Sequence, residues 1–149
     1  MTPGALTRAT RELVEAARAA RAHAFAPFSG FPVGAALRLA DGRIVAGCNV
    51  ENATFGLTVC AERVAVWKAI SEGARPGAFT ALAVVATAEV PTPPCGACRQ
   101  VLWEFCGDIP VVCVTDAGVV ATYRLAALLP APFDQSFLET PRKPGESGR

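Results

Sequence analysis

The spacing of apolar residues predicts an amphipathic helix near the start of the chain. Three- and four-residue steps separate the apolar positions, with arginines on the opposite side: Leu6, Leu13, Ala17, Ala20 and Ala24. This is the period of a helix that buries one face. The helix should end before the Ala26-Pro27 pair, because a residue that precedes proline avoids helical angles.

Five later segments have the length and apolar content of β-strands: 33–39, 44–48, 81–86, 111–115 and 119–123. The first two are separated by Asp41-Gly42, a dipeptide typical of tight hairpins. The last two flank Asp116-Ala117-Gly118, which has the composition of a turn. The sequence therefore predicts two hairpins and one separate buried strand.

Three further helices are predicted, at 60–72, 95–106 and 125–129. Gly73 and Gly107 are placed to end the first two, because glycine favours the left-handed angles at a helix end. Between strand and helix, residues 49–59 form a polar and aromatic loop too long to be a simple connection. Residues 133–138 suggest a last turn.

The order of these elements predicts an α/β fold. Helices follow the second and third strands, so crossover connections should make part of the sheet parallel. We expect a three-layer α-β-α sandwich around a five-stranded mixed sheet. Residues 1–139 should form a single domain, with 140–149 as a flexible tail rich in proline, glycine and charge.

Length, charge and cysteine content narrow the class of protein. A chain of 149 residues suits one domain, and 14 basic against 13 acidic residues give no surplus for a nucleic-acid partner. No apolar run approaches the ~18 residues of a membrane span. Six cysteines could indicate a secreted disulfide scaffold. Cys48, Cys106 and Cys113, however, lie in apolar runs typical of buried thiols, and this favours the reducing cytoplasm.

Two short motifs carry the candidate chemistry: Cys60-Ala61-Glu62 and Cys95-Gly96-Ala97-Cys98. Cysteines at positions i and i+3 lie on one face of a helix and can bind one ion. Structural zinc sites normally have four protein ligands, whereas catalytic sites have three and keep a place for water. Since the fourth thiol is missing and Glu62 stands beside the first, we interpret the motifs as a catalytic zinc site.

The surroundings of the cysteines fit this interpretation. Both motifs begin predicted helices, whose free N–H groups and partial positive charge favour thiolates. Arg63 or Arg99 could donate hydrogen bonds to sulfur and offset its charge. Taken alone, a C-x-x-C pair is equally a redox motif or half of a zinc finger, and Glu62 alone would be a solvated acid. His23, the only histidine, is read as a surface residue.

The combined motifs resemble the zinc-dependent deaminase superfamily, which pairs His or Cys-x-Glu with Pro-Cys-x-x-Cys. Three more segments are similar to the small homotetrameric cytidine deaminases: 28–37, 47–53 and 128–133. The likeness spans residues 10 to 135. It implies hydrolysis of cytidine, and of 2′-deoxycytidine, to the uracil nucleoside and ammonia.

The resemblance also implies residue roles. Cys60, Cys95 and Cys98 would bind one Zn²⁺, and Glu62 would carry protons from the attacking water to ring N3 and the leaving ammonia. The other roles concern the nucleoside: Asn49 and Glu51 at the ribose 3′-hydroxyl, Phe31 against the base, the Ala61 backbone at the pyrimidine edge, and Phe133 in a neighbouring subunit's site. A carboxylate at the ribose would repel phosphate, so nucleosides are expected rather than nucleotides.

Rival interpretations remain at this stage. Within the superfamily, the substrate could be another cytosine compound, such as the aminoacylated nucleoside antibiotic blasticidin S. From a different class, a zinc-stabilised binding module would explain the cysteines but not Glu62 or the polar loop. Pyrimidine salvage and clearance of modified nucleosides are both compatible with the sequence.

Overall fold

The computed structural model describes residues 6–139, and its strands form one five-stranded sheet in the order β2-β1-β3-β4-β5. The strands are β1 (Val33–Leu39), β2 (Ile44–Cys48), β3 (Phe79–Ala86), β4 (Pro110–Thr115) and β5 (Val120–Arg124). The pair β3 and β4 is parallel, and the other neighbouring pairs are antiparallel. The expected mixed sheet is confirmed.

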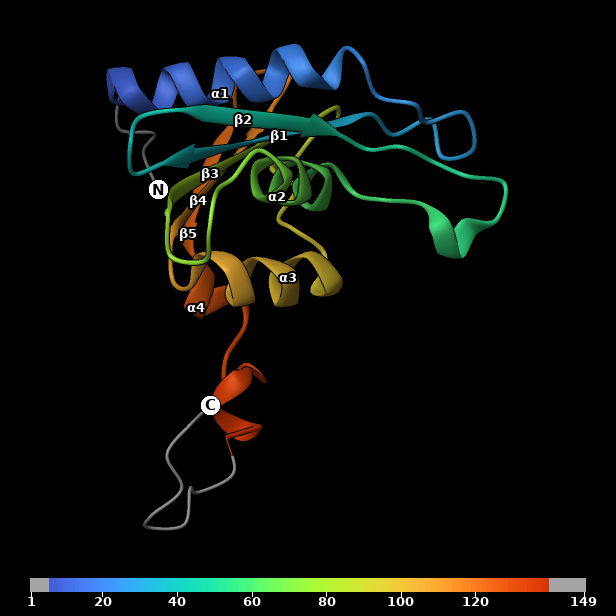
Figure 1. Ribbon diagram of the computed structural model, residues 1–149. Helices are drawn as coiled ribbons and strands as arrows, with labels where there is room; N and C mark the ends of the chain where they lie inside the picture. Colours follow the sequence, from blue (N-terminus) through green and yellow to red (C-terminus); the bar gives the residue numbers. More distant parts are fainter. Residues whose placement is uncertain (1–5, 140–149) are drawn as a thin grey trace, which may run out of the picture.

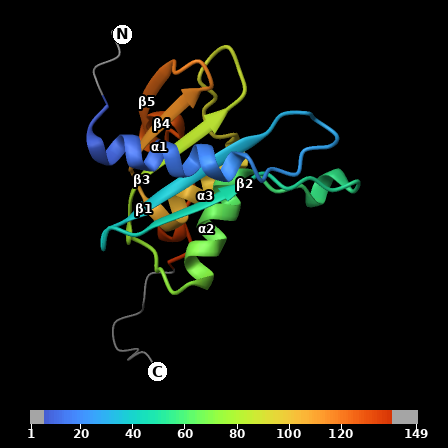
Figure 2. The ribbon, with the colours of Figure 1, turned by 90° about the horizontal axis from the view of Figure 1, so that it is seen from above.

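Helices cover both faces of this sheet. They are α1 (Arg8–Arg21), α2 (Ala61–Ser71), α3 (Gly96–Cys106) and α4 (Leu125–Leu128), with short 3₁₀ turns at η1 (Phe55–Leu57) and η2 (Gln135–Phe137). Figure 1 shows α1 on one face and α2 and α3 on the other, and Figure 2 shows α1 crossing the strands from above. The three-layer sandwich follows from this placement.

Alternation along the strands gives each layer its own core. Leu37, Leu82 and Val111 face α2 and α3, whereas their neighbours Ala36 and Ala83 face α1. All five of these side chains are fully buried. Because successive side chains of a strand point to opposite faces, a sheet covered on both sides reads as a continuous apolar run. This explains why the run at 81–86 predicted a strand without showing alternation.

Small residues bring the helices close to the sheet. A Cβ atom at Gly47 of β2 would lie 2.7 Å from the Ala65 nitrogen of α2, and one at Gly34 of β1 would lie 1.9 Å from the Ala17 oxygen of α1. Such distances exclude any side chain at either glycine. The buried face of α2 is likewise built from alanines, including Ala61 and Ala65. The start of α2 is therefore fixed closely against the sheet.

The boundaries of α1 differ from those expected. Thr7 caps the helix by accepting a hydrogen bond from the Thr10 nitrogen, so it begins at Arg8 rather than Leu6. It ends at Arg21 rather than Ala24, because the next residues turn away toward the Phe25 nitrogen, which donates to the Asn49 oxygen at 3.0 Å. The helix therefore ends at a contact with the segment around Asn49, several residues before Pro27.

Three further expectations concern the C-terminal tail, membrane-spanning helices and His23. The proposed tail over 140–149 lies outside the described residues. Within 6–139, no helix combines the length and apolar character that crossing a membrane requires. His23 is exposed, as predicted.

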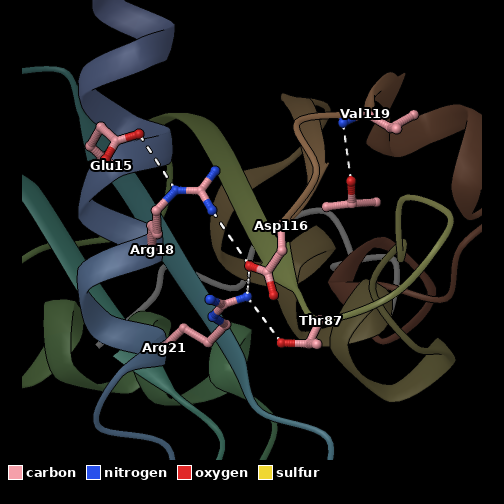
Figure 3. Close-up of polar contacts among 7 residues, drawn as sticks. Glu15, Arg18, Arg21, Thr87, Asp116 and Val119 are labelled. Carbon is pink, nitrogen blue, oxygen red and sulfur yellow. Dashed lines mark hydrogen bonds and ion pairs between the residues drawn. The ribbon is translucent and has the colours of Figure 1, made fainter.

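An ion-pair network fastens α1 to the carboxyl ends of the two parallel strands (Figure 3). Asp116, which follows β4, accepts from Arg21 and lies 3.5 Å from Arg18. Arg21 also donates to the Thr87 hydroxyl, just after β3, at 3.1 Å. Burial raises the pKa of Asp116, but hydrogen bonding by Thr87 and Arg21 and the charge of both arginines outweigh it and hold the pKa below its ordinary value.

Replacing Asp116→Asn should therefore lower the stability of the fold by about 0.5–1 kcal/mol, since the pair is partly exposed and screened by solvent. At neutral pH the melting temperature should fall by about 2–3 °C. Because the folded-state pKa is depressed, this contribution is present above pH ~3.9 and disappears as the pH falls through the folded value. Thermal melts of the wild type and the variant, at neutral pH and again below pH ~3.9, measure how much of the stability difference is lost.

Asp41→Asn is the control, because among residues 6–139 Asp41 forms an ion pair only with Arg43, two residues away in the same turn. It should leave the melting temperature within about 1 °C of that of the wild type. Equal losses from both variants would mean that Asp116 does not fasten α1.

Candidate active site

The three cysteines of the two motifs come together where two helices begin. Cys60 is the N-cap residue of α2, and Cys95 is the N-cap residue of α3. Cys98 lies one turn into α3 and is fully buried. The three sulfur atoms lie within 4.8 Å of one another, so they could hold one metal ion.

The geometry and surroundings of the cluster fit zinc. Two sulfurs bound to a tetrahedral zinc at about 2.3 Å lie about 3.8 Å apart, and the sulfurs of Cys60 and Cys95 are separated by 3.9 Å. Arg63 donates to the Cys60 sulfur at 3.3 Å, and its buried Nε has no hydrogen-bond partner among the described residues. A guanidinium held beside three thiols suits a cluster that carries negative charge.

The pKa values of two cysteines in the cluster shift in opposite directions. Hydrogen bonding from Cys98, and then the Arg63 guanidinium, lower the pKa of Cys60 to about 5 against the effect of burial. The same hydrogen bond to Cys60, together with burial, raises the pKa of Cys98. These contacts favour the thiolate form of Cys60, which is the form that binds metals.

Glu62 follows Cys60 in the first turn of α2, and its side chain is buried, with an exposed fraction of 5%. Burial is the main reason that its pKa rises to about 7, and the negative charge of Cys60 adds to the effect. A solvated helix acid, the simpler interpretation of this residue, would be exposed. The structure places instead a buried carboxyl beside the cysteine cluster.

A cavity of about 250 Å³ opens onto these groups. Most of the residues with predicted roles line it: Phe31, Asn49, Glu51, Cys60, Ala61, Glu62 and Cys95. They come from the segment before β1, the loop after β2, and the starts of α2 and α3. No side chain caps the N-terminus of α2 or of α3, so the first backbone N–H groups of these helices donate no hydrogen bond to a capping side chain.

Asn49 and Glu51 organise the wall formed by residues 28–33. The Asn49 amide accepts from the Val33 nitrogen and donates to the Phe31 oxygen, both at 2.9 Å. Glu51 accepts from the nitrogens of Phe28 and Ser29 at 2.9 and 3.0 Å. Both side chains are buried. They thus stay in place at the cavity wall before any ligand binds.

Two residues with predicted roles, Arg99 and Phe133, do not line this cavity. Arg99 donates to the carbonyl oxygens of Pro94 and Leu128, at 2.7 and 2.8 Å, and not to a ligand sulfur. The sequence offered Arg63 or Arg99 as the donor to sulfur, and of the two it is Arg63 that donates to the Cys60 sulfur. Arg99 instead secures the loop that leads into Cys95.

Phe133 does not line the cavity of its own chain. It is 58% exposed and stacks on Phe137 with ring centroids 5.6 Å apart. Its backbone oxygen accepts from Gln100 of α3 at 2.6 Å. In Figure 1 this segment extends from α4 away from the body of the domain.

Sequence reasoning missed other residues of the cavity, including Ser29, Thr58, Thr92 and Pro93. Ser29 lies inside one of the motifs behind the resemblance, yet it had no assigned role. Thr92 and Pro93 precede the metal-binding motif and looked like ordinary loop residues. The one sequence signal for a role of Ser29 at the cavity was its position two residues before Phe31.

Comparison with known proteins places this site in a family. The family model for the cytidine and deoxycytidylate deaminase zinc-binding region matches residues 7–115. The chain therefore belongs to the cytidine and deoxycytidylate deaminase family, as its motifs indicated.

Individual relatives agree in both sequence and structure. The cytidine deaminase of Sporosarcina psychrophila is 48% identical over 128 residues, which cover 85% of this chain and 93% of the relative. The crystal structure of cytidine deaminase from Burkholderia pseudomallei matches with a TM-score of 0.82 and 48% identity, covering 86% of this chain and all of that chain. The enzyme from Mycobacterium tuberculosis gives a TM-score of 0.71 at 43% identity, covering 83% and 96% of the two chains.

The cysteine cluster predicts one zinc ion per chain, measurable by elemental analysis after dialysis. Cys98→Ala removes one of three thiols and should weaken zinc binding by about 10²-fold or more. The control is Cys106→Ala, which makes the same change at a buried position of the same helix outside the cluster. Retention of one zinc by Cys98→Ala, or equal loss from both variants, would contradict the assignment.

Proposed function

We propose that this protein is a zinc-dependent cytidine deaminase that converts cytidine, and 2′-deoxycytidine, to the uracil nucleoside and ammonia. The observation that carries the proposal is that one cavity is lined by Glu62, Cys60 and Cys95 and also by Asn49 and Glu51. The first group suits hydrolytic chemistry, and the second suits a polar sugar. The family and the curated relatives support the same reaction.

Cys60, Cys95 and Cys98 would hold the zinc. When bound at such a site, zinc lowers the pKa of water to about 7, so that hydroxide is accessible at neutral pH. Arg63 would offset the charge of the thiolates through its hydrogen bond to Cys60. Three cysteines are one ligand fewer than a structural zinc site normally has, and catalytic zinc sites use such a set to bind water as well.

Glu62 would move both protons of the reaction. It takes one proton from the water whose oxygen bonds to C4 and delivers it to ring N3. It then carries the second proton from the new hydroxyl to the amino group, so that the C4–N bond breaks and ammonia leaves. The product has a C4 carbonyl and a proton on N3. A positioned carboxylate contributes about 10²–10⁴-fold to such a reaction.

The remaining residues of the cavity would bind the nucleoside. Phe31 would stack on the base, and the backbone at Ala61 would contact the pyrimidine edge. Asn49 and Glu51 would hold the ribose 3′-hydroxyl. A buried carboxylate accepts a hydrogen bond from a hydroxyl but repels phosphate, which favours nucleosides over nucleotides.

We further infer a homotetramer in the cytoplasm, acting in pyrimidine salvage, with active sites shared between subunits. Exposed apolar side chains on the segments next to the cavity support contact with another copy, namely Phe25, Phe28, Phe55 and Leu57. Phe28 and Phe55 pack edge to face at 5.6 Å, where the loop that carries η1 projects from the domain. The six cysteines of the chain are free thiols, which fits the reducing conditions of the cytoplasm.

Glu62→Ala tests the reaction and separates an enzyme from a zinc-stabilised binding module. We expect kcat for cytidine to fall by about 10²–10⁴-fold or more, while one zinc per chain remains. The loss of cytidine absorbance and the zinc content measure the two effects. Glu72→Ala, at the exposed end of the same helix, should keep full activity. A wild type that holds zinc but deaminates no cytosine nucleoside would sink the proposal.

Phe133→Ala tests the shared active sites. If Phe133 enters a neighbouring subunit's site, this variant should raise KM for cytidine by about tenfold, a loss expected for a buried aromatic contact. Coexpression with Glu62→Ala then creates some sites that have both Glu62 and a neighbour's Phe133. The mixed oligomer should exceed the summed activity of the two variants. Simple averaging would show that each chain's site is self-contained.

A further inference from the structure

Ser29 makes three hydrogen bonds at the cavity wall. Its nitrogen donates to Oε1 of Glu51 at 3.0 Å, and its hydroxyl donates to Oε2 of the same carboxylate. The hydroxyl oxygen in turn accepts from the Phe31 nitrogen at 3.0 Å. One small side chain therefore links the two residues to which we assign the sugar and the base.

The contacts of Glu51 leave little of its carboxylate free. A carboxylate offers about four acceptor positions on its two oxygens. Donors from Phe28 and Ser29 occupy three of them, two on Oε1 and one on Oε2. About one position remains for a ligand, and it is on the oxygen that Ser29 holds. The direction of that position thus depends on the Ser29 hydroxyl.

All three groups are donors, so together they favour the ionised form of the Glu51 carboxylate. The hydrogen bond from the Ser29 hydroxyl is the main reason that the pKa of Glu51 lies below its ordinary value, followed by those from the backbone. An ionised carboxylate only accepts hydrogen bonds. It therefore selects a ligand that presents a hydroxyl donor and disfavours one that presents a phosphate.

We propose that Ser29 is a positioning residue for substrate selection, which holds Glu51 as a fixed acceptor for one sugar hydroxyl. The inference rests on the proposed deaminase function and extends it to a residue with no assigned role. Ser29 itself does not take part in proton transfer, because its hydroxyl group donates its hydrogen bond to Glu51. Its contribution belongs to KM rather than to kcat.

The test is Ser29→Ala, which removes the hydroxyl and keeps the backbone donor. With cytidine, we expect KM to rise about tenfold or more, as for loss of a hydrogen bond to a charged group, with kcat within about twofold of that of the wild type. With 3′-deoxycytidine, which lacks the hydroxyl to be selected, the same variant should lose at least about threefold less. An equal loss on both substrates would overturn the proposal.

Two further variants separate positioning from a general structural effect. Ser29→Thr keeps the hydroxyl at an exposed position and should restore most of the lost affinity. Ser71→Ala removes a hydroxyl that donates to the Lys68 oxygen at the far end of α2, and it should match the wild type on both substrates. Failure of Ser29→Thr to restore KM, while its melting temperature matches that of the wild type, would count against the role of the hydroxyl.

The outcomes also distinguish this inference from the function on which it rests. A wild type that deaminates neither substrate would overturn both proposals. An active wild type with an equally active Ser29→Ala variant would overturn only the role of Ser29. In a Glu51→Gln background, Ser29→Ala should add little further loss, because its partner is already altered.

Discussion

The site depends on the meeting of two helix starts at one place on the sheet. Cys60 and Cys95 are N-cap residues of α2 and α3, so a single arrangement of these helices fixes the distance between their sulfurs. That distance, 3.9 Å, matches the spacing of two thiolates on tetrahedral zinc. Free N–H groups at both helix starts add partial positive charge where thiolates collect. Metal chemistry and helix packing therefore constrain each other.

Close packing against the sheet makes this arrangement rigid. The alanines of α2 and the absence of a side chain at Gly47 let the helix approach the strand almost to backbone contact. Two arginines add further contacts: Arg63 donates to the Cys60 sulfur, and Arg99 donates to the Pro94 oxygen in the loop before Cys95. On the opposite face, the pairing of Arg21 with Asp116 fastens α1 near the ends of the parallel strands. Each helical layer is thus held to the sheet by contacts of its own.

Much of the fold could be predicted from the chain alone. The period of apolar residues predicted the first helix, short apolar segments predicted the strands, and glycines indicated helix ends, as at Gly73 and Gly107. Errors concerned boundaries, where a contact distant in sequence decided the outcome. The end of α1 is the example, since Asn49 draws the chain away at Phe25. Local propensity carries no information about such a partner.

Residue types and their spacing were enough to predict the class of chemistry, from three thiols without a fourth and a carboxyl two residues after the first. Only the tertiary structure decided which neighbours complete the site. It gave the sulfur contact to Arg63 rather than Arg99, because carbonyl groups of Pro94 and Leu128 already occupy Arg99. It also joined Ser29 to Glu51 across 22 residues of sequence. Spacing along a helix fixes which groups share a face, whereas hydrogen-bond partners across loops depend on how the layers pack.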